Sequence, residues 1–221
     1  MYRPPFEKLE KASKEELLKI IRGTKSKMTR LRNVMEHPDY KNRTEWVDPS
    51  DDVIYKCDRE FLNLAIIKYL SLGGEYSYSK SELNDTEFND NLENISKIVF
   101  YNGTCFSIPQ KIVVDLSDNE LNIKVGDFAN TKSIETTYDK ENFLYELGEL
   151  HIGEWRHYYD TKRFGIAVLD GVQWFLEIQY KNGKKKKYAG SNAFPYNYGD
   201  LISLFNCVGM IEAPFLGEIE T

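Results

Sequence analysis

The segment VQWFLEIQYKNGKKKKYA, residues 172–189, carries the clearest structural signal in the chain. Its first half is apolar at every second position, which is the period of a β-strand with one buried face. A turn at 181–183 lets the chain return as a second strand. The pair Asp170-Gly171 predicts an earlier hairpin turn that follows a strand at 164–169. The apolar positions of the first half are Trp174, Leu176, Ile178 and Tyr180.

A helix is expected after these strands. Residues 190–195 leave the sheet, and a helix near 197–207 follows, for which Asn197 has the side chain of an N-cap. Trp174 is expected to pack beneath this helix, because large apolar side chains that alternate on a strand usually do so. The apolar positions of the helix are Leu201, Ile202, Leu204 and Phe205.

Further strands are expected upstream, where the apolar period changes to two at Ile95. Residues 98–108 predict a hairpin with its turn at Asn102-Gly103, since this dipeptide tolerates the positive φ of a type I′ turn. Asp139 is expected to begin a helix near 139–150. The other strand segments are 112–116, 121–125 and 132–138.

The N-terminal third of the chain has helical patterns. Ser13 and Glu16 match a capping box, in which each side chain accepts the other residue's backbone N–H. Gly23 is expected to interrupt this helix, and a second helical stretch follows at 25–36. The longest helix, 52–72, is apolar nearly all round in its second half, which predicts burial.

These patterns predict an α+β protein, with N-terminal helices followed by antiparallel β-hairpins or a meander and a packed C-terminal helix. The helical portion is expected at 1–74 and an acidic connector at 75–94. The antiparallel sheet, with its helices near 139–150 and 197–207, is expected within 95–221. The alternative is a single domain overall.

Composition narrows the class of protein. The chain has 221 residues, a net charge of −6 and 14% aromatic residues, as a folded protein has. No apolar run approaches the roughly 20 residues that span a bilayer, so no membrane partner is expected. Cys57, Cys105 and Cys207 form no CxxC pair, so neither a metal nor another cofactor is expected. The odd number of cysteines and a charged start without an apolar signal segment predict a cytoplasmic protein.

A longer pattern in the C-terminal half points to a relationship. The chain reads Trp155-x-x-x-Tyr159, then LDGVQWFLEI at 169–178, Gly183, and GSNAFPYN at 190–197. Over residues 139–207 this pattern resembles a module of an uncharacterised protein family of low-GC Gram-positive bacteria and their mobile elements. The resemblance implies a fold segment and a bacterial source, and it implies no chemistry.

Two groups of residues in this module are candidates for a binding site. An aromatic group could stack on a base or hold a peptide, or it could pack in the core. A glycine-containing group could aim backbone N–H groups at an anion beside a helix N-terminus, or it could only form the turn that leads to the helix. The first group is Trp155, Tyr158 and Tyr159, and the second is Gly190, Ser191 and Asn192.

The basic N-terminal segment, residues 8–32, offers a nucleic-acid site, since clustered lysine and arginine side chains release counterions from phosphates. The alternative is a solvated amphipathic helix, because acidic residues are interspersed in this segment. The candidate contacts are Lys25, Lys27, Arg30 and Arg32.

An enzyme is the least favoured class, because serine-hydrolase and kinase motifs are absent from the sequence. His151, Glu154 and His157 could act as general acids and bases only if the fold brought them together. The leading hypothesis is a non-enzymatic interaction protein, with another protein as its expected partner and a role in a mobile element or phage. Nucleic-acid binding through the N-terminal segment and an unrecognised enzyme are the alternatives.

Overall fold

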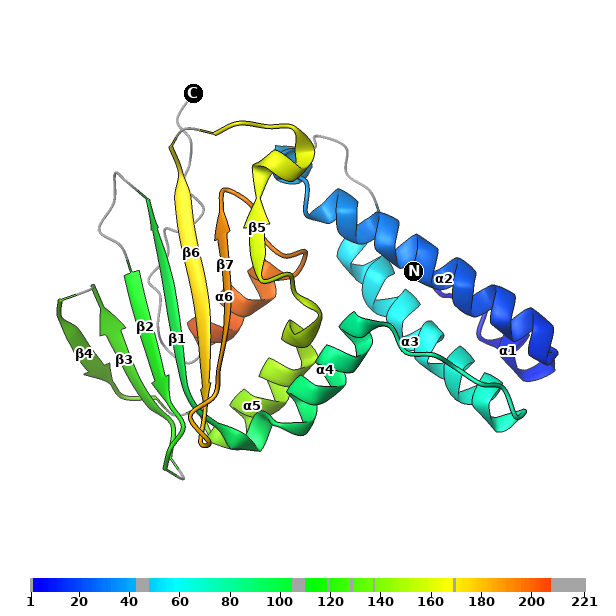
Figure 1. The fold of residues 1–221 in the computed structure, drawn as a ribbon, viewed down its shortest axis with the longest axis horizontal. Helices are drawn as coiled ribbons and strands as arrows, with labels where there is room; N and C mark the ends of the chain where they lie inside the picture. The colour runs from blue at the N-terminus through cyan, green and yellow to red at the C-terminus, as the bar shows by residue number, and fades with distance from the viewer. Residues whose placement is uncertain are drawn as a thin grey trace. The chain divides into compact units, whose positions relative to one another are not determined.

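The computed structural model describes residues 2–42, 48–104, 110–118, 120–127, 129–136, 138–168 and 170–207 of the chain. They belong to two compact units, Met1–Ser79 and Lys80–Thr221. The division lies within the acidic segment 75–94, directly before helix α4 (Lys80–Asp90). The element order confirms the predicted α+β class, with helices first and a mostly antiparallel sheet after them (Figure 1).

The first unit is helical. Its elements are α1 (Glu7–Lys11), α2 (Lys14–Met35), η1 (Pro38–Asn42) and α3 (Asp51–Ser71). The capping box at Ser13 is confirmed, since its Oγ accepts from the backbone N–H of Glu16, whose side chain accepts in return.

The predicted break of the first helix at Gly23 is wrong, because α2 continues through this residue. A single glycine costs a helix only about 1 kcal/mol relative to alanine. Leu17, Ile21 and Met28 are buried on both sides of Gly23, and this packing against α3 outweighs that cost.

Helix α3 is buried on one side only. Phe61, Leu62, Ala65, Ile66 and Tyr69 are buried, and this part of the prediction is confirmed. The prediction of burial all round is wrong, since α1 and α2 pack against one face of α3. The apolar side chains that stay exposed are Val53, Leu64, Ile67, Leu70 and Leu72.

The second unit is built on a seven-stranded sheet with the order β4-β3-β2-β1-β6-β7-β5. All neighbouring strands are antiparallel except β5, which runs parallel to β7. The strands are β1 (Ile95–Thr104), β2 (Gln110–Asp115), β3 (Asn122–Gly126), β4 (Thr131–Ile134), β5 (Tyr158–Asp160), β6 (Val172–Tyr180) and β7 (Lys185–Ser191).

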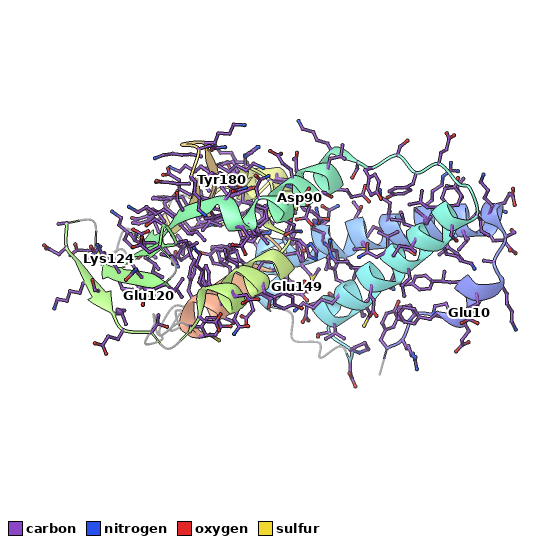
Figure 2. The ribbon with its side chains drawn as sticks, turned by 90° about the horizontal axis from the view of Figure 1, so that it is seen from below. Glu10, Asp90, Glu120, Lys124, Glu149 and Tyr180 are labelled. Atoms are coloured by element: carbon purple, nitrogen blue, oxygen red, sulfur yellow. The ribbon has the colours of Figure 1, made fainter. Side chains whose placement is uncertain are left out.

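Helices α5 (Lys140–Glu149) and α6 (Tyr198–Cys207) cover one face of this sheet (Figures 1 and 2), and α4 adds Phe88 to the same core. Asp139 caps α5 as predicted, and its carboxylate accepts from the backbone N–H of Asn142 at 2.8 Å. Trp174 is buried beneath α6 as predicted, with its ring centroid 5.1 Å from that of Tyr198. Short 3-10 turns complete the unit at η2 (Leu92–Asn94), η3 (Ile152–Glu154) and η4 (Thr161–Phe164).

The predicted hairpin turn at Asn102-Gly103 is wrong. Strand β1 runs through both residues, because Asn102 pairs with Gln110 of β2 on one side and with Trp174 of β6 on the other. A strand that is paired along both edges stays extended, whatever turn its sequence would tolerate. The connection from β1 to β2, residues 105–109, lies outside the described residues.

The predicted strand at 164–169 is also wrong in its described part. Residues 161–164 form η4, and residues 166–168 belong to no strand, while residue 169 lies outside the described residues. Strand β6 already pairs with β1 along one edge and with β7 along the other, so no edge remains for a preceding hairpin partner.

Candidate functional site

Within the second unit, the described helices that contribute to the core lie on one face of the sheet, and the side chains of the other face come from the alternate residues of the same strands. On β1 and β6 the residues Ile98, Phe100, Leu176 and Ile178 are buried under the helices. Their sequence neighbours point the other way, because successive side chains on a strand alternate between the faces. We define the open sheet face as three rows of these side chains, each in register across the strands. The first row is Lys124, Val113, Val99, Glu177 and Lys187, and the second is Lys111, Tyr101, Phe175, Ala189 and Tyr158. The third row is Asp115, Lys97, Gln179 and Lys185.

One row of the open sheet face crosses five strands. Tyr101 lies opposite Lys111 on β2 and opposite Phe175 on β6. Phe175 lies opposite Ala189 on β7, which in turn lies opposite Tyr158 on β5. Residues in register share a face of the sheet, so three aromatic side chains stand in this row.

The aromatic rings of this row are partly exposed. The rings of Tyr101 and Phe175 stack, with their centroids 5.2 Å apart and their planes 19° from parallel. The Nζ of Lys187 lies 4.3 Å from the centroid of the Phe175 ring, within the range of a cation–π contact. Tyr158 is 56% exposed, and the small Ala189 separates it from Phe175.

The three rows contain five lysines and two carboxylates, so the open sheet face is positive although the chain carries −6. A hydrogen bond from the Ser117 hydroxyl lowers the pKa of Asp115, and the nearby charges of Lys97 and Lys124 lower it further. Burial alone would raise the pKa of Glu177, but hydrogen bonds from Gln179 and Lys185 lower it. The Nζ of Lys185 lies 3.1 Å from a carboxylate oxygen of Glu177. Both acids are therefore ionised at neutral pH, and they balance only part of the lysine charge.

Of the three aromatic residues predicted as a binding group, only Tyr158 is at the surface. Trp155 and Tyr159 are 5% and 4% exposed and belong to the core. The indole Nε1 of Trp155 donates to Asn197 Oδ1 at 3.0 Å, and the Tyr159 hydroxyl accepts from the backbone N–H of Arg156 at 3.1 Å. The core-packing alternative therefore holds for these two side chains.

The residues Gly190, Ser191 and Asn192 close the end of β7 against β6. Asn192 Oδ1 accepts from the backbone N–H of Val172 at 2.7 Å, and Ser191 Oγ accepts from Gln173 Nε2 at 2.6 Å. A Cβ on Gly190 would lie 2.4 Å from the indole nitrogen of Trp174, so this position requires glycine. These three residues lie at the end of β7, before helix α6 begins at Tyr198, and their contacts are with β6.

Asn197 does not cap α6 with its side chain, contrary to the prediction. Its amide nitrogen donates to the carbonyl of Leu150 at 2.6 Å, and its amide oxygen accepts from Trp155. Both partners are buried, and a buried polar group without a partner is costly, so the amide is used there.

Three of the four basic residues predicted to bind nucleic acid make contacts within the first unit. The Nζ of Lys25 donates to the Tyr76 hydroxyl at 2.8 Å. Lys27 forms an ion pair of 2.7 Å with the buried Asp58, and Arg32 donates to the Tyr55 hydroxyl at 2.8 Å. Arg30 is exposed on α2. These internal contacts engage three of the charges that the hypothesis assigned to phosphates.

The histidine residues of the enzyme hypothesis have other partners. His151 Nδ1 lies 2.7 Å from Asp85 Oδ2, and the ring of His157 stacks on that of Tyr188 with centroids 5.8 Å apart. No group of three or more histidine, cysteine or carboxylate side chains in the described part of the chain could hold a metal ion.

Sequence reasoning missed Tyr101, Phe175 and the lysines around them as a group. The available signal was the alternation of side chains between the two faces of a strand. If Trp174 and Leu176 face the core, then Phe175 faces away from it. The Lys184–Lys187 run divides in the same way, because Lys185 and Lys187 lie on the open sheet face while Lys186 forms an ion pair with Glu87 at 3.3 Å.

Comparison with protein-family models, with curated proteins and with solved structures finds no match to this chain. Among the described residues, no helix combines the length and the hydropathy that crossing a bilayer requires.

Proposed function

We propose that this chain is a non-enzymatic interaction protein that binds another macromolecule through the open sheet face. The observation that carries this proposal is the row Tyr101–Phe175–Tyr158, in which partly exposed aromatic side chains run from the inner strands β1 and β6 to the edge strand β5. The solvated face of an antiparallel sheet is usually polar. Exposed aromatic residues among polar ones are typical of surfaces that bind macromolecules.

The proposal extends to the setting of the protein. The resemblance of residues 139–207 supports a protein of low-GC Gram-positive bacteria and their mobile elements. The odd number of cysteines supports the bacterial cytoplasm as its location. The partner is then a cytoplasmic macromolecule of the host or of the element.

Photo-cross-linking in the cells that express the protein tests this proposal. The variant Phe175→p-benzoylphenylalanine places a reactive ring in the centre of the open sheet face, and the same substitution at Tyr145 of α5 is its matched control. Tyr145 is 67% exposed and lies on a helix, away from the proposed surface.

We expect light-dependent adducts of higher mass from position 175 and none at comparable yield from position 145. Digestion of the adduct with nuclease or with protease identifies the class of the partner. Equal yields from both positions, or no adduct from position 175, would overturn the proposal.

A further inference from the structure

We propose that the open sheet face binds a single-stranded nucleic acid. This inference rests on the proposed function and names the class of its partner. It is independent of the basic N-terminal segment, where Lys25, Lys27 and Arg32 make contacts within the first unit.

The first argument is the chemistry of the aromatic row. Every nucleobase presents a π-face, and exposed aromatic side chains on a groove or a sheet are the usual platforms on which unpaired bases stack. Tyr101 and Phe175 stand side by side on neighbouring strands, and Tyr158 lies two strands beyond Phe175, about 10 Å away at the usual strand spacing. The row thus offers two separate stacking places along one line.

The second argument is the charge around that row. The five lysines of the open sheet face lie on four different strands and surround the rings; they are Lys97, Lys111, Lys124, Lys185 and Lys187. A partner that places anionic groups around a planar ring matches this arrangement, and a nucleotide carries both. The chain as a whole is negative, with a net charge of −6, so it is not expected to attract polyanions over its entire surface. The positive charge of the open sheet face is a local feature.

The third argument is the position of Lys187. Its ammonium lies over the Phe175 ring, and its side chain is exposed. A base that stacks on this ring displaces the ammonium, which can then turn to a phosphate of the same strand. The cation–π contact therefore occupies the stacking place in the unbound protein.

The sheet geometry favours a single strand over a duplex. A protein reads the major groove with a helix or a two-stranded ribbon that enters it, whereas the rings of Tyr101 and Phe175 stand on neighbouring inner strands of a seven-stranded sheet. Bases within a duplex are stacked on one another and cannot reach such rings, but unpaired bases can be splayed onto them.

Fluorescence anisotropy with the full-length protein tests the inference. The probes are labelled oligothymidine and oligouridine of about 20 nucleotides, with a duplex of the same length as the competitor. We expect both single strands to bind more tightly than the duplex. If all five lysines contact phosphates, the affinity falls about 100-fold between about 50 mM and about 200 mM salt, since the logarithmic slope is then about −3.5.

Two substitutions separate stacking from charge. Phe175→Ala is expected to weaken binding about tenfold or more, the usual effect of losing one base–aromatic stack. Lys187→Glu is expected to weaken binding and to reduce the salt dependence. The matched controls are Tyr145→Ala on α5 and Lys181→Ala in the turn after β6, which should change the affinity less than twofold.

Circular dichroism of each variant shows that the fold is retained, and Lys187→Glu keeps the test valid if Phe175→Ala destabilises the protein. Absence of binding at about 50 mM salt, equal affinity for the duplex, or an unchanged affinity of both variants would overturn the inference. A protein adduct from position 175 in the cross-linking experiment would then still support the proposed function with another partner class.

Discussion

The two faces of the sheet use neighbouring residues of the same chemical class for opposite purposes. On the covered face, Trp174 is 2% exposed, and its indole N–H donates to the carbonyl of Ala193 at 2.8 Å. On the open sheet face, Phe175 stacks on Tyr101 beneath the ammonium of Lys187. The comparison teaches that the face of the sheet to which a strand position points decides whether an aromatic ring stabilises the fold or is available to a partner. The amount of aromatic surface does not decide this.

The largest expected difference between the faces is in stability. Trp174→Ala is expected to lower the free energy of unfolding by about 3–5 kcal/mol, because it leaves a cavity among the helices and removes a donor to Ala193. Phe175→Ala is expected to cost less than about 1.5 kcal/mol, because its ring is already partly in water. Urea unfolding monitored by far-UV circular dichroism measures both. Equal losses would show that the open sheet face is buried in solution.

A smaller difference is expected for polar side chains. Asn197→Ala leaves the indole N–H of Trp155 and the carbonyl of Leu150 without this partner, and we expect a loss of about 1–3 kcal/mol. Gln179→Ala on the open sheet face serves as the control and should change stability by less than about 0.5 kcal/mol. The same urea titration compares the two, and a negligible cost for Asn197→Ala would contradict the buried network.

The smallest difference concerns pH and Tyr180, which lies on the covered face. Burial raises the pKa of its hydroxyl to about 12, and the charge of Glu87 adds to this effect. The folded-state pKa lies above the unfolded value of about 10, so the neutral hydroxyl contributes to the free energy of unfolding below pH 10. This contribution is lost as the pH rises towards 12. The hydroxyl has no hydrogen-bond partner among the described residues.

Tyr180→Phe is therefore expected to leave stability at pH 7 within about 0.5 kcal/mol of the wild type. Above pH 10 the variant should become the more stable of the two proteins, because it has no hydroxyl to ionise. Thermal unfolding at pH 7 and at pH 11 measures this crossover. An identical pH dependence for both proteins would mean that Tyr180 ionises without a penalty from burial.

The elements that the sequence predicted correctly depend on local patterns. The capping box at Ser13, the N-cap at Asp139 and the alternation of residues 172–180 each involve residues that are close in the chain. Secondary structure set by neighbours in sequence can be read from those neighbours alone.

The elements that were wrong depend on distant partners. Asn102-Gly103 fits either a turn or a strand, and the pairing with β6, more than 60 residues later in the chain, decides between them. The amide of Asn197 could cap its own helix or bind Leu150 and Trp155, and the packing of η3 decides. The open sheet face was missed for the same reason, since its aromatic row exists only when β1, β6, β7 and β5 are in register.

The parallel strand β5 has a consequence for the order of events during translation. Residues 158–160 leave the ribosome before residues 189–191, with which they pair, have emerged. Trp155 must likewise wait for Asn197 before its indole nitrogen finds an acceptor. The edge of the sheet is therefore completed after the segment up to about residue 200 has emerged, and a nascent chain arrested before β7 exposes Trp155 and Tyr159 to chaperones.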